Sequence, residues 1–159
     1  MSDKTIPIMK NKNETVLKIG SIIALGIALV GVLYLFKEKY IFSTNPITIL
    51  IQIVSIFIMI WARYTFGFRS FHAAANSTKG KLITTGPYHF LRHPIYASLI
   101  YFFWASVISY PFIETTVAVI CISAGLFIRM ILEEKFLVVA YDDYAAYSKR
   151  TKRIIPYLF

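Results

Sequence analysis

Residues 95–132 read IYASLIYFFWASVISYPFIETTVAVICISAGLFIRMIL, and this stretch decides the fold. It contains two apolar runs, at 95–113 and 115–132. Each run approaches the ~20 residues that a helix needs to cross about 30 Å of hydrocarbon. Only residues 111–114 lie near the turn between the two runs. The pattern therefore predicts a tight antiparallel hairpin of two membrane-spanning helices.

Two further apolar runs precede this hairpin, at residues 19–36 and 46–62. The first is uncharged and lacks a small-residue cleavage site, which favours an anchor over a signal peptide. Its glycines allow neighbouring membrane helices to approach closely. Pro46 suits the first turn of the second helix. The sequence therefore predicts an all-α integral membrane protein with four transmembrane helices.

The composition also indicates a membrane protein. Hydrophobic residues make up 57% of the 159 residues, charged residues make up 16%, and the mean hydropathy is +0.63. Soluble domains usually have about 45–50% apolar and about 25% charged residues. The net charge of +9 is compatible with nucleic-acid binding. In so apolar a chain, charge that orients the loops in a bilayer is the better interpretation, and no nucleic-acid partner is expected.

The basic residues predict the orientation of the helices, because lysine and arginine concentrate on the cytoplasmic side of a membrane. With both termini inside, fifteen of the seventeen basic residues are cytoplasmic, and only Lys37 and Lys39 lie outside. The polar segments 63–94 and 133–159 then share the cytoplasmic face. We therefore expect a multi-pass protein with both termini in the cytoplasm.

Beyond residue 132 the last apolar helix is expected to leave the bilayer and continue to about Ala140. Asp142 or Asp143 would then cap a short helix that carries Tyr144 and Tyr147 on one face. This arrangement predicts a cytosolic C-terminal helical segment.

The most informative polar stretch is GPYHFLRHPIY at residues 86–96. Pro87 and Pro94 oppose a continuous helix and favour extended conformations in the residues before them. Arg92 and His93 would lie where the third membrane helix starts, at the membrane–water boundary. Tyrosine and arginine side chains at that depth often serve as anchors. Anchoring alone does not require Gly-Pro-Tyr followed by Arg-His-Pro, so the run as a whole indicates a functional site.

Arg129 and Glu133 form a second candidate site. They lie four residues apart on the predicted fourth helix, so their side chains share a face. A charged side chain inside a membrane costs about 2.5–3.5 kcal/mol at the bilayer centre on insertion scales. Arg129 therefore requires either a structural partner, such as Glu133 or Glu134, or a functional anion to bind.

Other chemistries receive little support. The three histidines lack the spacing of a zinc site, and the single cysteine, Cys121, excludes a cysteine cluster, so no metal site is predicted. Glycine-rich phosphate loops and nucleophile elbows are also missing from the sequence. The basic run at residues 149–153 is typical of contacts with anionic lipid head groups.

These elements resemble the isoprenylcysteine carboxyl methyltransferase family, which has distant relatives among the phospholipid methyltransferases. The resemblance covers roughly residues 60–159, with a looser match at Trp61-Ala62-Arg63 and Thr65-Phe66-Gly67. It rests on several spaced elements in the right order: Gly86-Pro87-Tyr88, Arg92-His93-Pro94, Tyr96, Arg129, Glu133-Glu134, Tyr144, Tyr147 and Pro156.

The resemblance implies a membrane enzyme that transfers a methyl group from S-adenosylmethionine. Residues 1–159 would form one domain, with a two-helix region at 1–62 and a catalytic region at 63–159. Arg129 would bind the acceptor, and Arg129, Glu133 and His93 would be the catalytic residues. Gly80 stands where members that methylate prenylated proteins often have a histidine. By family position the cofactor would contact Gly80, Lys81, Leu82, Ile83, Tyr88, His93, Pro94, Ile95, Tyr96 and Glu133.

Simple chemistry is consistent with those roles. An acceptor that is already a carboxylate needs positioning rather than a protein nucleophile, and positioning is worth up to about 7–11 kcal/mol. Arg129 could hold such a carboxylate at two points. An acceptor amine would need a base, for which His93 or Glu133 could serve.

Three functions therefore stay open. The first is carboxyl methylation of a lipophilic, isoprenylcysteine-like acid, the second is N-methylation of a lipid amine such as an ethanolamine head group, and the third is a non-catalytic four-helix membrane protein. No transit or retention signal is recognised in the sequence, which favours a prokaryotic inner membrane.

Overall fold

The computed structural model describes residues 5–67 and 82–158. Within these residues the chain is helical, and its only β-type pairing is an isolated parallel bridge between Leu91 and Lys152. The all-α prediction is therefore confirmed for this part of the chain. The elements in chain order are α1 (Thr5–Lys37), α2 (Pro46–Phe66), the 3-10 helix η2 (Gly86–His89), α3 (Pro94–Ser109), α4 (Ile113–Ala140) and α5 (Tyr144–Arg150).

Prolines and caps set several helix starts, as the sequence predicts. Pro46 and Pro94 occupy the first turns of α2 and α3, where a missing N–H breaks no helical hydrogen bond. The Asn45 side chain caps α2 by accepting a hydrogen bond from the Ile47 N–H at 2.9 Å. Asp143 stands at the N-cap position of α5, but its side chain makes no capping bond. The start of α5 is correctly predicted, whereas the side-chain cap is not formed.

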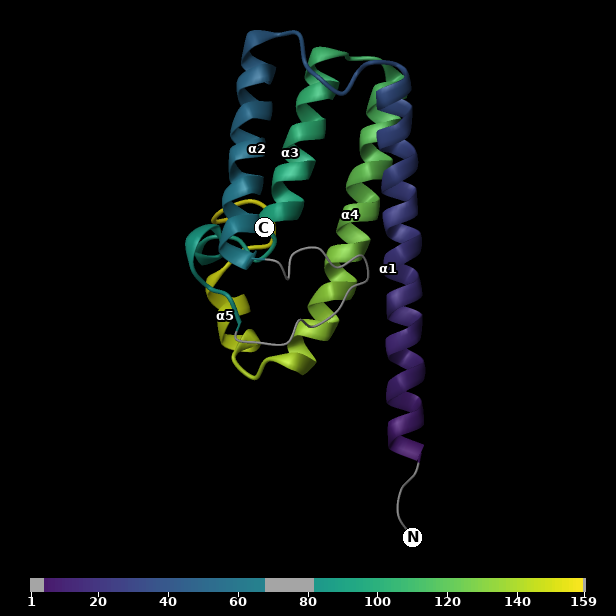
Figure 1. The fold of residues 1–159 in the computed structure, drawn as a ribbon, viewed down its shortest axis with the longest axis vertical. Helices are drawn as coiled ribbons and strands as arrows, with labels where there is room; N and C mark the ends of the chain where they lie inside the picture. Colours follow the sequence, from purple (N-terminus) through teal and green to yellow (C-terminus); the bar gives the residue numbers. More distant parts are fainter. Residues whose placement is uncertain (1–4, 68–81, 159) are drawn as a thin grey trace.

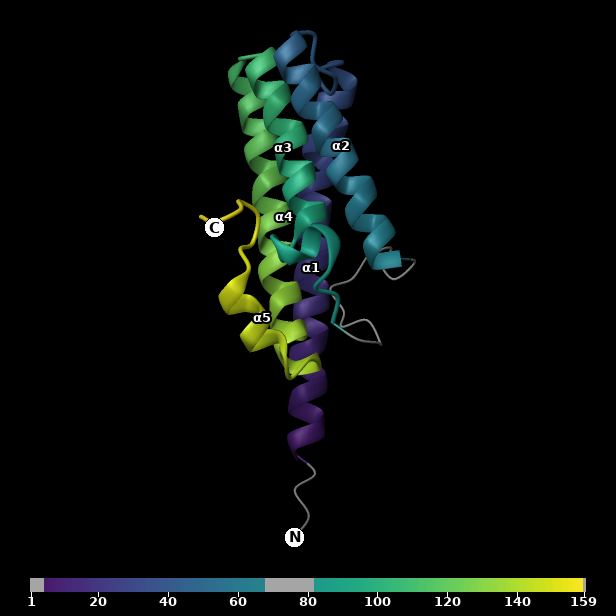
Figure 2. The same ribbon diagram turned by 90° about the vertical axis from the view of Figure 1, so that its left-hand side faces the viewer.

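The four long helices alternate in direction (Figure 1). The links from α1 to α2 and from α3 to α4 lie at one end of the bundle. At the other end, η2 and α5 lie beside the start of α3 and the last turns of α4 (Figures 1 and 2). We call this second end the site end. Helix α1 packs along α4, and α2 packs along α3.

Helix lengths support three membrane spans by length and composition. Among the described residues these are Thr15–Lys37, Pro46–Phe66 and Ile113–Ala140. Helix α3 is apolar but has 16 residues, or roughly 24 Å at about 1.5 Å per residue. It ends at Ser109 rather than near residue 113, because Pro111 disfavours a helical conformation at Tyr110. Helix α1 begins at Thr5, well before the predicted apolar run.

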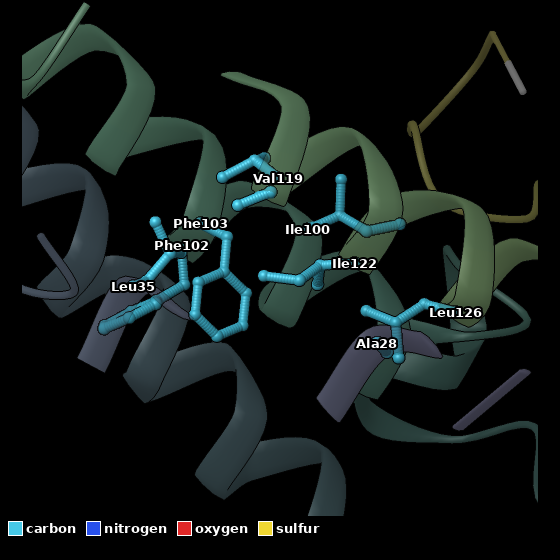
Figure 3. Close-up of a cluster of buried hydrophobic side chains, with 9 residues drawn as sticks. Ala28, Leu35, Ile100, Phe102, Phe103, Val119, Ile122 and Leu126 are labelled. Atoms are coloured by element: carbon cyan, nitrogen blue, oxygen red, sulfur yellow. The ribbon is translucent and has the colours of Figure 1, made fainter. Parts of the chain in front are cut away.

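The apolar core lies between α1, α3 and α4 (Figure 3). Its buried side chains come from all three helices and are Ala28, Leu35, Ile100, Phe102, Phe103, Ala118, Val119, Ile122 and Leu126. Small residues let α1 and α4 approach each other closely. A Cβ atom at Gly125 of α4 would lie 2.4 Å from the carbonyl oxygen of Ala24 and 3.0 Å from the backbone nitrogen of Ala28 on α1. Glycine is therefore required at this crossing.

We expect Gly125→Ala to lower the stability of the protein in detergent by about 1–3 kcal/mol, since the added methyl group would force α1 away from α4. The matched control is Gly26→Ala on α1, where a Cβ would meet nothing within 4 Å. That control should be neutral or slightly stabilising, because alanine favours helix over glycine. Thermal unfolding of both variants measures the difference. Equal melting temperatures would contradict the close α1–α4 packing.

Candidate functional site

A glycine allows the polypeptide before α3 to approach α2 closely. Gly86 has φ = 58°, in the left-handed region that glycine adopts readily. A Cβ atom there would lie 2.8 Å from Oγ1 of Thr65 and 3.3 Å from Nε1 of Trp61. Close contact with α2 thus excludes a side chain at residue 86. The neighbouring η2 helix buries Tyr88, whose ring lies 5.6 Å from that of Phe66, measured between centroids.

A chain of hydrogen bonds crosses the bundle at the site end. Nε of Arg129 donates to the hydroxyl of Tyr96 at 2.8 Å, and this hydroxyl donates to Oε2 of Glu133 at 2.7 Å. Nη1 of Arg129 donates to Oγ of Ser21 on α1 at 3.1 Å. Helices α1, α3 and α4 each contribute to this chain. We call Ser21, Tyr96, Arg129 and Glu133 the Tyr96 chain.

The Tyr96 chain places a positive and a negative group side by side in an apolar setting. Arg129 is only 7% exposed, and Ser21 is fully buried. Transfer of an arginine to the bilayer centre costs about 2.5–3.5 kcal/mol on insertion scales, and hydrogen bonds to the guanidinium offset part of such a cost. The predicted shared face of Arg129 and Glu133 is confirmed, with the Tyr96 hydroxyl bridging them.

A second cluster surrounds Glu134, the next residue on α4. Oε1 of Glu134 lies 3.4 Å from Nε of Arg92 and 3.2 Å from Nε2 of His93. Its Oε2 accepts hydrogen bonds from Nη2 and Nε of Arg153, at 3.0 and 3.1 Å. The side chain of Glu134 is 12% exposed and that of His93 is 4% exposed. We call these four residues the Glu134 cluster.

The segment after α5 lies against the loop between η2 and α3. The Arg92 N–H donates to the carbonyl of Lys152 at 2.7 Å, and the His93 N–H donates to that of Arg153 at 3.1 Å. The hydroxyl of Tyr147 donates to the carbonyl of Tyr88 at 2.7 Å. We call residues 147–154 the strap, because they tie α5 to this loop and, through Arg153, to α4.

Buried tyrosines reinforce the strap. Tyr144 and Tyr147 both face inward from α5, as the sequence predicts. Burial raises the pKa of Tyr147 to about 12 and raises the pKa of Tyr144 above its usual value. Burial and the nearby charge of Glu133 also raise the pKa of Tyr88. Because a raised pKa favours the neutral phenol, the Tyr147 hydroxyl stays a hydrogen-bond donor throughout the physiological pH range.

The structure brings most of the candidate residues identified from the sequence to the site end. Tyr96, Arg129 and Glu133 are joined by hydrogen bonds, and the ring of His93 lies 5.6 Å from that of Tyr96. Pro94 is buried and Ile95 half-buried in the first turn of α3. Leu82 and Ile83 are half-buried in the stretch that precedes η2. Gly80 and Lys81 lie outside the described residues.

Sequence reasoning missed Ser21 and the central position of Glu134. Ser21 lies more than a hundred residues from Arg129 in the chain, and nothing in the local sequence marks it as a partner. The sequence indicates Glu134 as an alternative partner for Arg129 and as part of the family resemblance, but not as the centre of a basic cluster. The three basic residues that surround it come from distant positions, so only the fold brings them together.

The arrangement can bind groups of both charges. Glu133, with the Tyr96 and Tyr88 rings near it, suits a cationic ligand, because carboxylates and aromatic faces both attract cations. The guanidinium of Arg129 suits an anionic group. Such a site combines side chains of α1, α3 and α4 at the site end.

These features define an integral membrane protein with a polar site at one end of a helical bundle. The phospholipid methyltransferase family matches residues 40–144, which is more than half of the chain. The protein belongs to this family, and membership indicates a membrane methyltransferase. The matched region includes α2, α3 and α4 but neither α1 nor the strap. Comparisons with curated proteins and with solved structures found no match.

We expect Glu134→Gln to loosen the strap, because it removes the charge that Arg92, His93 and Arg153 share. Loss of one partner from a buried ion pair costs up to about 3–5 kcal/mol. The variant should unfold at a lower temperature, and trypsin should cleave faster at the basic residues of the strap. The control is Lys135→Gln, which alters the next, exposed residue of α4. Unchanged cleavage in Glu134→Gln would show that the cluster does not hold the strap.

Proposed function

We propose that this protein is an S-adenosylmethionine-dependent methyltransferase that acts on a lipophilic acceptor in the membrane. The observation that carries the proposal is the Tyr96 chain, which holds a carboxylate and a guanidinium next to each other at the site end. Family membership supports methyl transfer, and the apolar helices support an acceptor that approaches from the lipid.

The residues at the site end are chemically suited to this cofactor. When bound, S-adenosylmethionine supplies an electrophilic methyl group on a positively charged sulfur and becomes S-adenosylhomocysteine. Glu133 would bind a cationic part of it, and the rings of Tyr88 and Tyr96 would contribute cation–π attraction. The residues proposed to complete this binding site are Gly80, Lys81, Leu82, Ile83, His93, Pro94 and Ile95.

Arg129 is the proposed acceptor-binding residue. Its planar guanidinium can hold a carboxylate at two points, as carboxyl methylation of an isoprenylcysteine-like acid would require. Ser21 and Tyr96 orient the guanidinium, since each accepts a hydrogen bond from it. An acid already ionised at neutral pH needs no general base. The contribution of Arg129 is then orientation of the acceptor oxygen.

N-methylation of a phospholipid amine is the second candidate, and the description of the matched family favours it. An amine acceptor must lose a proton, so a base is needed. Glu133 and His93 are the proposed bases. His93 already faces Glu134, with Nε2 and Oε1 3.2 Å apart, whereas Glu133 accepts a hydrogen bond from the Tyr96 hydroxyl and forms no ion pair with the residues that the structure describes. Glu133 is therefore the better placed of the two.

We also propose the topology that the basic residues predict. Helix α3 would span the membrane in addition to α1, α2 and α4. Both termini would lie in the cytoplasm of a prokaryotic cell. The alternating directions of α1 to α4 support this arrangement (Figure 1). The cofactor would then enter from the cytoplasm, at the site end, and the acceptor from the bilayer. The whole chain would act as one domain, with residues 63–159 forming its catalytic region.

Calorimetric binding of S-adenosylhomocysteine to the detergent-purified protein tests the cofactor proposal. We expect Glu133→Gln and Tyr96→Phe to weaken binding by about 10- to 100-fold, since each disrupts a hydrogen bond that involves a charged group. Lys135→Gln is the control and should bind as the wild type does. If well-folded wild-type protein fails to bind S-adenosylhomocysteine, the methyltransferase proposal is wrong.

Membranes incubated with methyl-labelled S-adenosylmethionine test the acceptor. A methyl ester releases labelled methanol in mild base, whereas an N-methyl group does not. If the acceptor is a carboxylate, Arg129→Lys should reduce the base-labile product by about 10- to 100-fold, because lysine cannot reproduce the two-point contact. Binding of S-adenosylhomocysteine should weaken by a smaller factor than product formation, because Glu133 keeps its hydrogen bond from Tyr96. Label that resists base would instead support the phospholipid amine.

A further inference from the structure

The end of the strap turns back along α3. The hydroxyl of Tyr101, in the third turn of α3, donates a hydrogen bond to the carbonyl of Ile154. The side chain of Ile154 packs against the hydrophobic core. Figures 1 and 2 show the chain rising from α5 to the level of the first turns of α3. Ile154 therefore lies beside α3, and the exposed residues 155–158 follow it directly in the chain.

These residues expose apolar side chains at that level. Tyr157 is 84% exposed and Leu158 is 77% exposed, and Ile155 is also exposed. They follow a polar segment and belong to no helix. Apolar side chains of this size at the edge of a bilayer are stabilised when they enter the boundary between head groups and acyl chains.

Exposed cations lie immediately before the apolar residues. Lys149, Arg150 and Lys152 are all exposed, whereas Arg153 is bound by Glu134. Residues 144–158 contain no aspartate or glutamate, so these positive charges are not neutralised within their own segment. A basic cluster next to apolar side chains at the membrane surface is complementary to anionic lipid head groups.

We propose that residues 149–158 form an interfacial anchor that binds the head groups of anionic phospholipids. Lys149, Arg150 and Lys152 contact the head groups, and Ile155, Tyr157 and Leu158 enter the boundary region beneath them. The proposal concerns a surface outside the Tyr96 chain and does not depend on the methyltransferase activity.

The anchor has a structural consequence for the site end. The backbone of Lys152 pairs with the loop before α3, accepting a hydrogen bond from the Arg92 N–H at 2.7 Å. A lipid bound by the Lys152 side chain thus acts on the same residue that holds this loop. Anionic lipid should therefore stabilise the strap.

Native mass spectrometry of the detergent-solubilised full chain tests head-group binding, with phosphatidylglycerol as the anionic probe and phosphatidylcholine as the neutral one. We expect the wild type to retain phosphatidylglycerol preferentially. Each lysine near a membrane surface contributes about 5-fold to such binding, so Lys149→Gln with Lys152→Gln should weaken it by about 25-fold. The matched control replaces Lys37 and Lys39, two exposed lysines at the opposite end of the bundle, with glutamine. Lys149→Arg with Lys152→Arg should preserve the binding of phosphatidylglycerol.

Equal retention of phosphatidylglycerol by the 149/152 glutamine variant and the wild type would overturn the proposal. An equal loss in the 37/39 control would also overturn it, because binding would then reflect net charge alone.

A nitroxide label reports whether the apolar residues enter the bilayer. After Cys121→Ala removes the native cysteine, Leu158→Cys carries the label in vesicles that contain phosphatidylglycerol, and Ala146→Cys on the exposed part of α5 serves as the control. The label at 158 should be relaxed by oxygen, which concentrates in lipid, and the label at 146 by a water-soluble nickel complex. Nickel accessibility that is equal at both positions would contradict insertion.

Discussion

The carboxylate of Glu134 is the interaction on which the site end depends. It lies between the loop before α3 and the strap, two segments that are also joined by backbone hydrogen bonds and by the buried side chain of Tyr147. An ionised carboxylate that is largely removed from water requires compensating partners. Arg153 donates hydrogen bonds to it, and Arg92 and His93 lie within ion-pair distance. Tight packing against α1 fixes the position of α4. Because Glu134 lies on α4, its contacts also fix where the strap and the loop before α3 lie. Separate polar segments thereby acquire a defined geometry.

The Tyr96 chain keeps the guanidinium of Arg129 and the carboxylate of Glu133 close together without direct contact between them through the Tyr96 hydroxyl. A phenol hydroxyl accepts one hydrogen bond and donates another, so it can lie between a guanidinium and a carboxylate. In an apolar environment each of these bonds is stronger than it would be in water, and an unpaired member would be costly. The Tyr96 chain therefore depends on α3, which carries Tyr96, as well as on α4. Helix α1 lies outside the family match but contributes Ser21, which accepts a hydrogen bond from Arg129.

Much of the fold could be predicted from the sequence, because its strongest signals are local. Apolar runs, proline at helix starts and the shared face of residues four apart all follow from the chain itself, and they placed α2, α4, α5 and the pair of Arg129 and Glu133 correctly. The end of α3 was predicted too late, because the apolar residues around Pro111 look like a continuing span. The partners of Ser21 and Glu134 could not be predicted, since they depend on contacts between segments far apart in the chain.

The adjacency of Glu133 and Glu134 links the two polar groups. Neighbouring residues on an α-helix point about 100° apart, so one turn of α4 can serve two separate surfaces. Glu133 faces the Tyr96 chain, and Glu134 faces the strap and the loop before α3. A rotation or shift of the last turns of α4 would therefore change both surfaces together. Arg153 joins the strap to Glu134, and Glu133 is the preceding residue on the same helix. The order of the strap and the geometry of the Tyr96 chain are thus two consequences of one helix position.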